Sequence, residues 1–269
     1  MWVIALFLAA HDPIASAAKP TKAVARVISV SPTLTEIVCA IGACDRLVGV
    51  TRFCDMPERV KALPKIGGFV DPSVEAALAL KPDLVLLTMN GANKPFTEAL
   101  DRAKVAWIAF HDDTLDDFAV IVKTLGESLA VQANAKSAID QFERDLALVS
   151  SQAKVNATAL VVYGHAPLIV AGPETFGAEL LARIGASNAY DGKQRYPTLD
   201  FETLVRLKPR WLIDVDMRGD GSAEPEYYQP IRALLEKTGT RFVFAPDPAL
   251  LRLGPRLPNA MLALRMGLR

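Results

Sequence analysis

Short apolar runs of strand length alternate with stretches of helical spacing along most of the chain. The runs expected to form strands are rich in β-branched and other apolar residues: 24–30 (VARVISV), 47–50 (LVGV), 83–87 (DLVLL), 105–110 (VAWIAF), 159–164 (ALVVYG), 211–215 (WLIDV) and 241–245 (RFVFA). Helices are expected between them, at 33–41, 72–80, 95–103, 175–184, 199–207 and 227–238. Strands that alternate with helices in this way predict an α/β fold with parallel sheets covered on both faces.

The middle of the chain, from Thr114 to about Lys154, carries no strand pattern. Two apolar stripes of helical period run through it: Leu115, Phe118, Val122, Leu125 and Leu129, and then Ile139, Phe142, Leu146 and Val149. The second helix should run about 20 residues, or roughly 30 Å. A helix of that length between two α/β units predicts a rigid connection rather than a hinge.

Two segments occur twice, once on each side of this helical middle. VDPSVEAALALKPDLVLL begins at Val70 and PTLDFETLVRLKPRWLID begins at Pro197, so that Phe69 is matched by Tyr196 and Glu75 by Glu202. In the same order, EIVCAIGA at 36–43 is matched by ELLARIGA at 179–186, and each copy carries a glycine where a helix end favours a left-handed residue. The repetition predicts two similar lobes.

Each copy of the longer segment predicts a capped helix. In the first copy Asp71 is the expected N-cap, with Pro72 at the first helical position and Glu75 in the first turn. In the second copy Thr198 is the expected cap, with Asp200 and Glu202 in the first turn. An early glutamate can simply interact favourably with the helix dipole, but this does not explain why both copies keep one at the same position.

The matched aromatic residues Phe69 and Tyr196 fall in strand-to-helix loops. Ligands of parallel α/β sheets bind beyond the carboxyl ends of the strands, in loops of this kind. Two such lobes would bring the two rings to opposite walls of one cleft, suited to a flat and largely apolar ligand. The alternative is that each ring fills its own lobe.

Composition limits the classes of function. Half of the residues are apolar (51%), and 30 acidic side chains balance 30 basic ones, which argues against a general nucleic-acid binder. The first 18 residues resemble a signal peptide, with the apolar run WVIALFLAA and a small-x-small site at Ala15–Ala17; the alternative is a buried N-terminal element. The mature protein is therefore expected to be exported and soluble.

Cysteines and histidines do not form a recognisable metal site. Cys39 and Cys44 could pair at a helix end, and Cys54 would then stay single, but connectivity cannot be read from sequence. No CxxC motif or His-rich ligand spacing occurs, so neither a tight protein-built metal site nor a resident cofactor is expected.

An enzyme with two α/β lobes around a cleft is the competing class of function. The sequence contains no GxGxxG after a first strand, no GxxxxGK[ST] phosphate loop and no GxSxG. No Ser–His–Asp or Cys–His arrangement stands out either. We therefore expect a binding protein rather than an enzyme.

Three stretches together carry a resemblance to a known family: RVISVSPTLTEIVCAIGACDRLVGVTRFCDMPE, LPKIGGFVDPSVEAALALKPDLVLL and YPTLDFETLVRLKPRWLI. The chain resembles the periplasmic substrate-binding proteins of ABC importers for vitamin B12, haem and iron–siderophores, and B12-binding members are the most similar. The resemblance implies two Rossmann-like lobes bridged by a single long α-helix, the class III binding-protein fold. The expected ranges are a signal peptide at 1–18, an N-terminal lobe at 24–112, a helical segment at 113–154 and a C-terminal lobe at 155–269.

The resemblance also implies roles for single residues. In this family a surface glutamate on each lobe docks onto arginines of the membrane permease, and Glu75 and Glu202 match those positions. The aromatic ligand-contact positions are matched by Phe53, Phe69, Tyr163 and Tyr196. Haem-binding members use a tyrosine just before the position of Phe69, where this chain has Gly68, so haem is disfavoured.

Three further residues are candidates for the same cleft. Arg52 would suit an acidic chelate or a phosphate-bearing side arm, unless it is only a solvated loop charge. His165 could cap the ligand or coordinate its metal, unless it is only hydrogen-bonded. Asp247 follows the last strand, in the loop region that closes the pockets of the family.

The expected ligand is a cobalt corrinoid, with a ferric siderophore or another metal chelate as the alternative. The expected partners are the permease and ATPase of an ABC importer. A third class of function is a binding protein that hands its ligand-bound form to a sensor instead of a transporter.

Overall fold

The computed structural model describes residues 14–16, 23–89, 94–165, 167–215, 226–244 and 247–268. The chain folds as two compact units. Unit 1 comprises residues 1–31 and 46–111, and unit 2 comprises residues 32–45 and 112–269. These boundaries differ from the expected lobes, because residues 32–45 and the helical middle both belong to unit 2.

Unit 1 is built on a five-stranded sheet with the strand order β1-β5-β4-β2-β3. Its strands are β1 (Ile14–Ser16), β2 (Val27–Ser29), β3 (Leu47–Val50), β4 (Leu84–Thr88) and β5 (Ala106–Phe110). The strands β2 to β5 are parallel, as expected, whereas β1 pairs antiparallel with β5 at the edge. Helices α2 (Val74–Ala79) and α3 (Lys94–Arg102) pack on the sheet through a core that includes Ile28, Val85, Phe96 and Leu100.

Only part of the expected signal peptide lies within the described residues. Ile14–Ser16 forms β1, with Ile14 opposite Phe110 and Ser16 opposite Ile108. The rest of 1–18 lies outside the described residues, so the signal peptide stays a prediction.

Unit 2 is built on a six-stranded sheet with the order β11-β10-β6-β7-β9, and β8 also pairs with β6. Its strands are β6 (Thr158–His165), β7 (Leu168–Val170), β8 (Ser187–Asn188), β9 (Thr198–Leu199), β10 (Trp211–Asp214) and β11 (Arg241–Phe244). The strands β6, β8, β10 and β11 are parallel, but β7 and β9 run antiparallel to their neighbours. The expectation of an all-parallel sheet is wrong for this edge.

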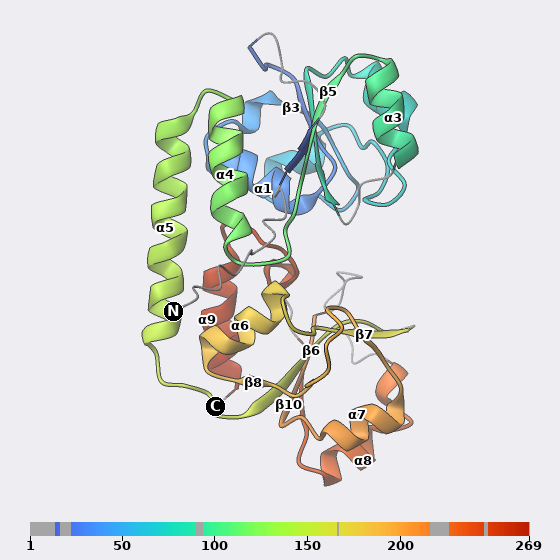
Figure 1. Cartoon of the computed structure of the whole chain (residues 1–269), viewed down its shortest axis with the longest axis vertical. Coiled ribbons are helices and arrows are strands. Elements are labelled where there is room, and N and C mark those ends of the chain that lie inside the picture. Colours follow the sequence, from blue (N-terminus) through green and yellow to red (C-terminus); the bar gives the residue numbers. More distant parts are fainter. Residues whose placement is uncertain are drawn as a thin grey trace, which may run out of the picture. The chain divides into compact units, whose positions relative to one another are not determined.

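Helices make up most of the rest of unit 2: α1 (Pro32–Ala40), α4 (Asp117–Ser128), α5 (Gln132–Ser151), α6 (Phe176–Ile184), α7 (Phe201–Leu207), α8 (Arg232–Lys237) and α9 (Leu257–Gly267). The helical middle of the sequence forms α4 and α5, which lie side by side (Figure 1). The rings of Phe118 and Phe142 stack between these helices, with centroids 3.8 Å apart. At 20 residues, α5 has the expected length. None of the helices in the described part of the chain is long and apolar enough to cross a bilayer.

The doubled segment adopts the same local structure in both units. Ser73 caps α2 by accepting a hydrogen bond from the amide of Ala76, and Asp200 caps α7 by accepting one from Thr203. Both helices are followed by a left-handed lysine, Lys81 and Lys208, each with φ of 46°. The caps predicted at Asp71 and Thr198 are therefore wrong: each helix begins later, and Thr198 instead lies in β9.

The shorter repeat forms two matching helix ends. Gly42 after α1 and Gly185 after α6 both have positive φ, at 79° and 77°. In each case the glycine amide donates to the carbonyl three residues back and the next amide donates five residues back. This is the Schellman pattern, and it confirms the left-handed residue expected at each of the two glycines.

A disulfide joins Cys39 to Cys44, and the buried Cys54 is not part of a disulfide. The bond closes the turn between α1 and the short 3-10 helix at Cys44–Arg46. In unit 1, Cys54 Sγ lies 3.1 Å from the hydroxyl of Thr51.

Candidate functional site

Three candidate residues of unit 1 lie on two loops that are joined to each other. Arg52 and Phe53 follow β3, and Phe69 lies in the loop that leads to α2. The amide of Arg52 donates to the carbonyl of Gly67 at 2.9 Å, which ties the first loop to the second. Phe53 keeps 46% of its surface exposed and Phe69 is half-buried. We call Arg52, Phe53, Phe69 and Asp71 the unit 1 rim.

Arg52 is not an isolated loop charge. Its guanidinium donates to both carboxylate oxygens of Asp71, at 3.0 to 3.3 Å, and lies 4.9 Å from the centroid of the Phe53 ring. The arginine is therefore held over an exposed aromatic ring by a carboxylate from the second loop.

Two candidate residues of unit 2, Tyr163 on β6 and Tyr196 before β9, face each other with ring centroids 6.1 Å apart. Tyr196 is 41% exposed, and its hydroxyl donates to the buried carboxylate of Asp113 at 3.0 Å. Arg195 approaches the other oxygen of that carboxylate at 3.4 Å. This arrangement holds the Tyr196 side chain in place while leaving 41% of the residue exposed.

Both tyrosines stay neutral at ordinary pH. Burial raises the pKa of Tyr163 well above its usual range, and the neighbouring Tyr196 adds to the rise. The pKa of Tyr196 is also raised, first by burial and then by the negative charge of Asp113. The Tyr163 hydroxyl is buried and the Tyr196 hydroxyl already donates to Asp113, so the exposed part of Tyr196 is what this pair could offer a ligand.

His165 lies at the carboxyl end of β6, within a cluster of aromatic residues. Its Nε2 is 2.6 Å from Oδ2 of Asp214, a buried carboxylate at the end of β10. The imidazole contacts Tyr227 and Tyr228, with centroids 5.7 and 5.6 Å away. His165 is therefore hydrogen-bonded within unit 2, as the alternative to a ligand-binding role expected. A role in ligand binding stays a prediction.

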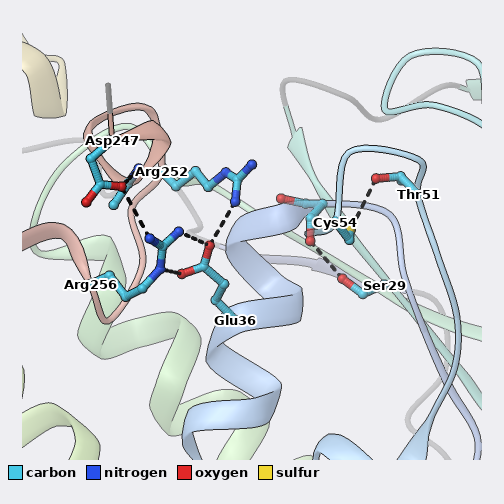
Figure 2. A network of polar contacts seen from close by, with 9 residues as sticks. Ser29, Glu36, Thr51, Cys54, Asp247, Arg252 and Arg256 are labelled. Atoms are coloured by element: carbon cyan, nitrogen blue, oxygen red, sulfur yellow. Dashed lines mark hydrogen bonds and ion pairs between the residues drawn. The ribbon is translucent and has the colours of Figure 1, made fainter. Parts of the chain in front are cut away.

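Asp247 belongs to a charged network that the sequence did not predict (Figure 2). It caps the 3-10 helix Pro248–Leu251 and accepts a hydrogen bond from Arg256 at 3.2 Å. Arg256 and Arg252 both bind the carboxylate of Glu36, which comes from α1, at 2.8 to 2.9 Å. This Glu36 network is contained within unit 2, and its geometry gives Asp247 a structural role.

The two expected docking residues occupy the same place in each unit. Glu75 is the second residue of α2, and Glu202 is the second residue of α7. Both side chains are exposed. Each helix is capped by a different residue, Ser73 or Asp200, so neither glutamate is needed as the cap.

The sequence reading missed the acidic partners of the candidate residues, Asp113 and Asp214. Each follows or ends a predicted parallel strand, in HDD after β5 and in WLID of β10. An acidic residue at the carboxyl end of such a strand is a signal that could have found both.

Comparison with known proteins places the fold in a family. The sequence profile of the periplasmic binding proteins matches residues 27–230, which is most of the chain. The chain belongs to the periplasmic binding protein family. Members of this family are transport proteins that bind small molecules for ABC importers.

Two curated relatives of this periplasmic binding protein are vitamin B12-binding proteins. The vitamin B12-binding protein of Pectobacterium carotovorum is 25% identical over 237 residues, covering 86% of this chain and 84% of the relative. That of Yersinia pestis is 29% identical over 201 residues, covering 72% of this chain and 70% of the relative.

Solved structures with the same fold bind more varied ligands. A possible iron-binding protein of Staphylococcus epidermidis has a TM-score of 0.75 at 22% identity, covering 91% of this chain and 98% of that one. The vitamin B12-binding protein of Vibrio cholerae has a TM-score of 0.74 at 20% identity, covering 91% and 97%. A haem-binding protein of Pseudomonas aeruginosa has a TM-score of 0.73 at 29% identity, covering 91% and 92%. Together they establish the class III binding-protein fold for this chain.

Proposed function

We propose that this periplasmic binding protein captures a corrinoid and delivers it to the permease of an ABC importer. The observation that carries the proposal is that each unit leaves a large aromatic residue exposed in a candidate ligand loop, Phe53 in unit 1 and Tyr196 in unit 2. Flat, largely apolar macrocycles bind well on such surfaces. The names of the curated relatives support a corrinoid.

A ferric chelate is the second candidate ligand. The similarity to a possible iron-binding protein supports it, and the same exposed rings would suit an aromatic chelate. The metal in either ligand is cargo that arrives and leaves with the ligand.

The proposal includes export and docking. Cleavage of the predicted signal peptide near Ala17 would remove β1 and leave β5 at the edge of the unit 1 sheet. The exposed Glu75 and Glu202 would then provide one carboxylate on each unit for arginines of the permease, mainly setting orientation, because exposed ion pairs contribute little affinity.

The test is a titration of the purified mature protein with cyanocobalamin, dicyanocobinamide and ferric siderophores, followed by calorimetry and tyrosine fluorescence. We expect both corrinoids to bind, and Phe53→Ala and Tyr196→Ala each to weaken binding by roughly tenfold, because each removes an aromatic contact. The matched control is Leu234→Ala on α8, which removes a half-exposed apolar side chain from another part of unit 2. Binding of ferric chelates in place of both corrinoids would overturn the choice of ligand.

A further inference from the structure

The ion pair between Arg52 and Asp71 lies on the unit 1 rim itself. Arg52 stacks on the exposed ring of Phe53, and Asp71 lies two residues after Phe69. The side chains are 50% and 59% exposed, so water reaches both partners in the unliganded protein. A ligand that stacks on Phe53 would cover this pair.

Gly68 leaves the space that the Arg52–Asp71 ion pair occupies. A Cβ atom at position 68 would overlap Oδ1 of Asp71 and would lie 2.6 Å from Nη2 of Arg52. A larger residue there would push one partner away from the backbone of the loop. The glycine in the second loop therefore leaves room for the positive and negative charge to stay in contact beside the aromatic ring.

Two other cations near these loops, Lys61 and Lys65, have partners away from the Phe53 ring. Lys61 pairs with Glu58 at 2.7 Å. Lys65 donates to the carbonyls of Val60 and Cys54, at 3.1 and 3.5 Å. Arg52 is thus a cation that lies over the Phe53 ring, and a carboxylate already compensates its charge.

We propose that the Arg52–Asp71 pair selects ligands whose side arms are uncharged, and disfavours carboxylates. The inference rests on the proposed function, because it concerns the ligand of the same site. A ligand amide can accept a hydrogen bond from Arg52 through its oxygen and donate one to Asp71 through its nitrogen. The pair then stays intact.

A ligand carboxylate cannot be accommodated in this way. It would have to take Arg52 away from Asp71, or lie beside Asp71 with the same sign of charge. Because the ligand excludes water, Asp71 would remain as a desolvated carboxylate without its partner, which is strongly unfavourable. In solution the exposed pair has only a small effect on stability, so its main effect appears on binding.

The test compares cyanocobalamin with its monocarboxylic acids, in which one side-chain amide is hydrolysed to a carboxylate. Calorimetry of the wild-type protein should show about tenfold tighter binding of the all-amide form. Asp71→Asn should reduce this preference below about threefold or invert it, because Arg52 becomes available to the carboxylate. Arg52→Gln should increase the preference, because only the negative charge remains.

The matched control is Glu98→Gln on α3, which changes the net charge of unit 1 by the same amount at an exposed site. It should keep the wild-type preference. Equal binding of amide and acid by the wild type, or the same preference in Asp71→Asn and Glu98→Gln, would overturn this inference and leave the corrinoid proposal standing. Binding of neither form by the wild type would overturn both. Thermal unfolding shows whether each variant is folded. Because Arg52→Gln and Asp71→Asn should shift the preference for the amide form in opposite directions, they test the inference independently.

Discussion

Among single residues, Glu36 combines deep burial with full pairing. Only 4% of its side chain is exposed, and both carboxylate oxygens accept hydrogen bonds from Arg252 or Arg256. The arginines come from the C-terminal segment, 216 and 220 residues later in the chain. The network therefore fixes this segment to α1 within unit 2.

Glu36→Ala should strongly destabilise unit 2. It removes the negative charge between two partly buried arginines, and breaking a buried pair in this way costs about 3–5 kcal/mol. Urea unfolding followed by circular dichroism would measure the change. The control is Asp140→Asn, which breaks an exposed i,i+4 pair with Lys136 on α5 and should cost less than about 0.5 kcal/mol. Similar losses for the two variants would show that the Glu36 network contributes little.

Buried tyrosines should make unit 2 sensitive to alkaline pH. Burial, together with the charge of Asp214, raises the pKa of Tyr228, and burial raises that of Tyr163. The unfolded chain loses these protons near pH 10 while the folded chain keeps them, so the stability present below pH 10 is lost as the pH rises further. Each tyrosine should lower the free energy of unfolding by about 1.4 kcal/mol per pH unit above that point. Unfolding measured at a series of pH values, with Tyr228→Phe reducing the slope, would check this; a slope unchanged by the substitution would contradict it.

Among the elements, α1 ends in a turn closed by the Cys39–Cys44 disulfide. The turn also contains the left-handed Gly42, and Asn134 of α5 donates to the carbonyl of Ile41 at 3.1 Å. The end of α1 is thus held in three ways, and the loop that the disulfide closes is short.

Replacing both cysteines by alanine should therefore have a limited effect. A loop of about five residues corresponds to about 2 kcal/mol of chain entropy in the unfolded state. Urea unfolding of Cys39→Ala with Cys44→Ala should show a loss of about this size, and reductant should have no further effect on the variant. A wild-type protein whose unfolding does not respond to reductant, or a loss far above about 2 kcal/mol in the variant, would contradict this.

The strands and helices that the sequence predicted are those with a clear period and sufficient length. The parallel strands β2 to β6, β10 and β11 were expected, and so were α4 and α5. The strands β7, β8 and β9 have only two or three residues, too few to show alternation. Helix α9 was missed although its buried Leu257, Met261 and Leu264 recur at helical spacing. The burial of Arg265, whose guanidinium donates to the carbonyl of Ala153, is a tertiary contact that periodicity does not contain.

In the candidate site, some aromatic residues could be predicted from the sequence, but their acidic partners could not. Aromatic residues in strand-to-helix loops can be recognised locally, and this gave Phe69 and Tyr196, whereas Phe53 came from the resemblance to the family. Their partners come from distant segments: Asp113 lies 83 residues from Tyr196, and Asp214 lies 49 residues from His165. Contacts over such separations depend on strand order, which local periodicity does not contain.

For the whole molecule, the repeat gives each unit one exposed glutamate at the same helical position. Glu75 in α2 and Glu202 in α7 both follow a polar cap by two residues, and both helices end at a left-handed lysine. The dipole of a helix explains an acidic residue in the first turn, but either glutamate could serve that purpose at another position. Docking onto a partner with two matching cations would explain why both units keep it.

The double variant Glu75→Ala with Glu202→Ala should leave corrinoid affinity unchanged and abolish stimulation of the importer ATPase, because neither residue belongs to the unit 1 rim or the tyrosine pair. Each exposed pair is worth up to about 1 kcal/mol, so losing both weakens docking by up to roughly 30-fold, with single variants intermediate. ATPase assays with the permease complex in proteoliposomes would measure this, and wild-type stimulation should fall with added salt.

The matched control, Glu98→Ala with Glu143→Ala, removes one exposed carboxylate from each unit and should stimulate normally. If the double variant stimulates like this control, the two glutamates do not dock the permease, and their shared position reflects only the first turn of a helix.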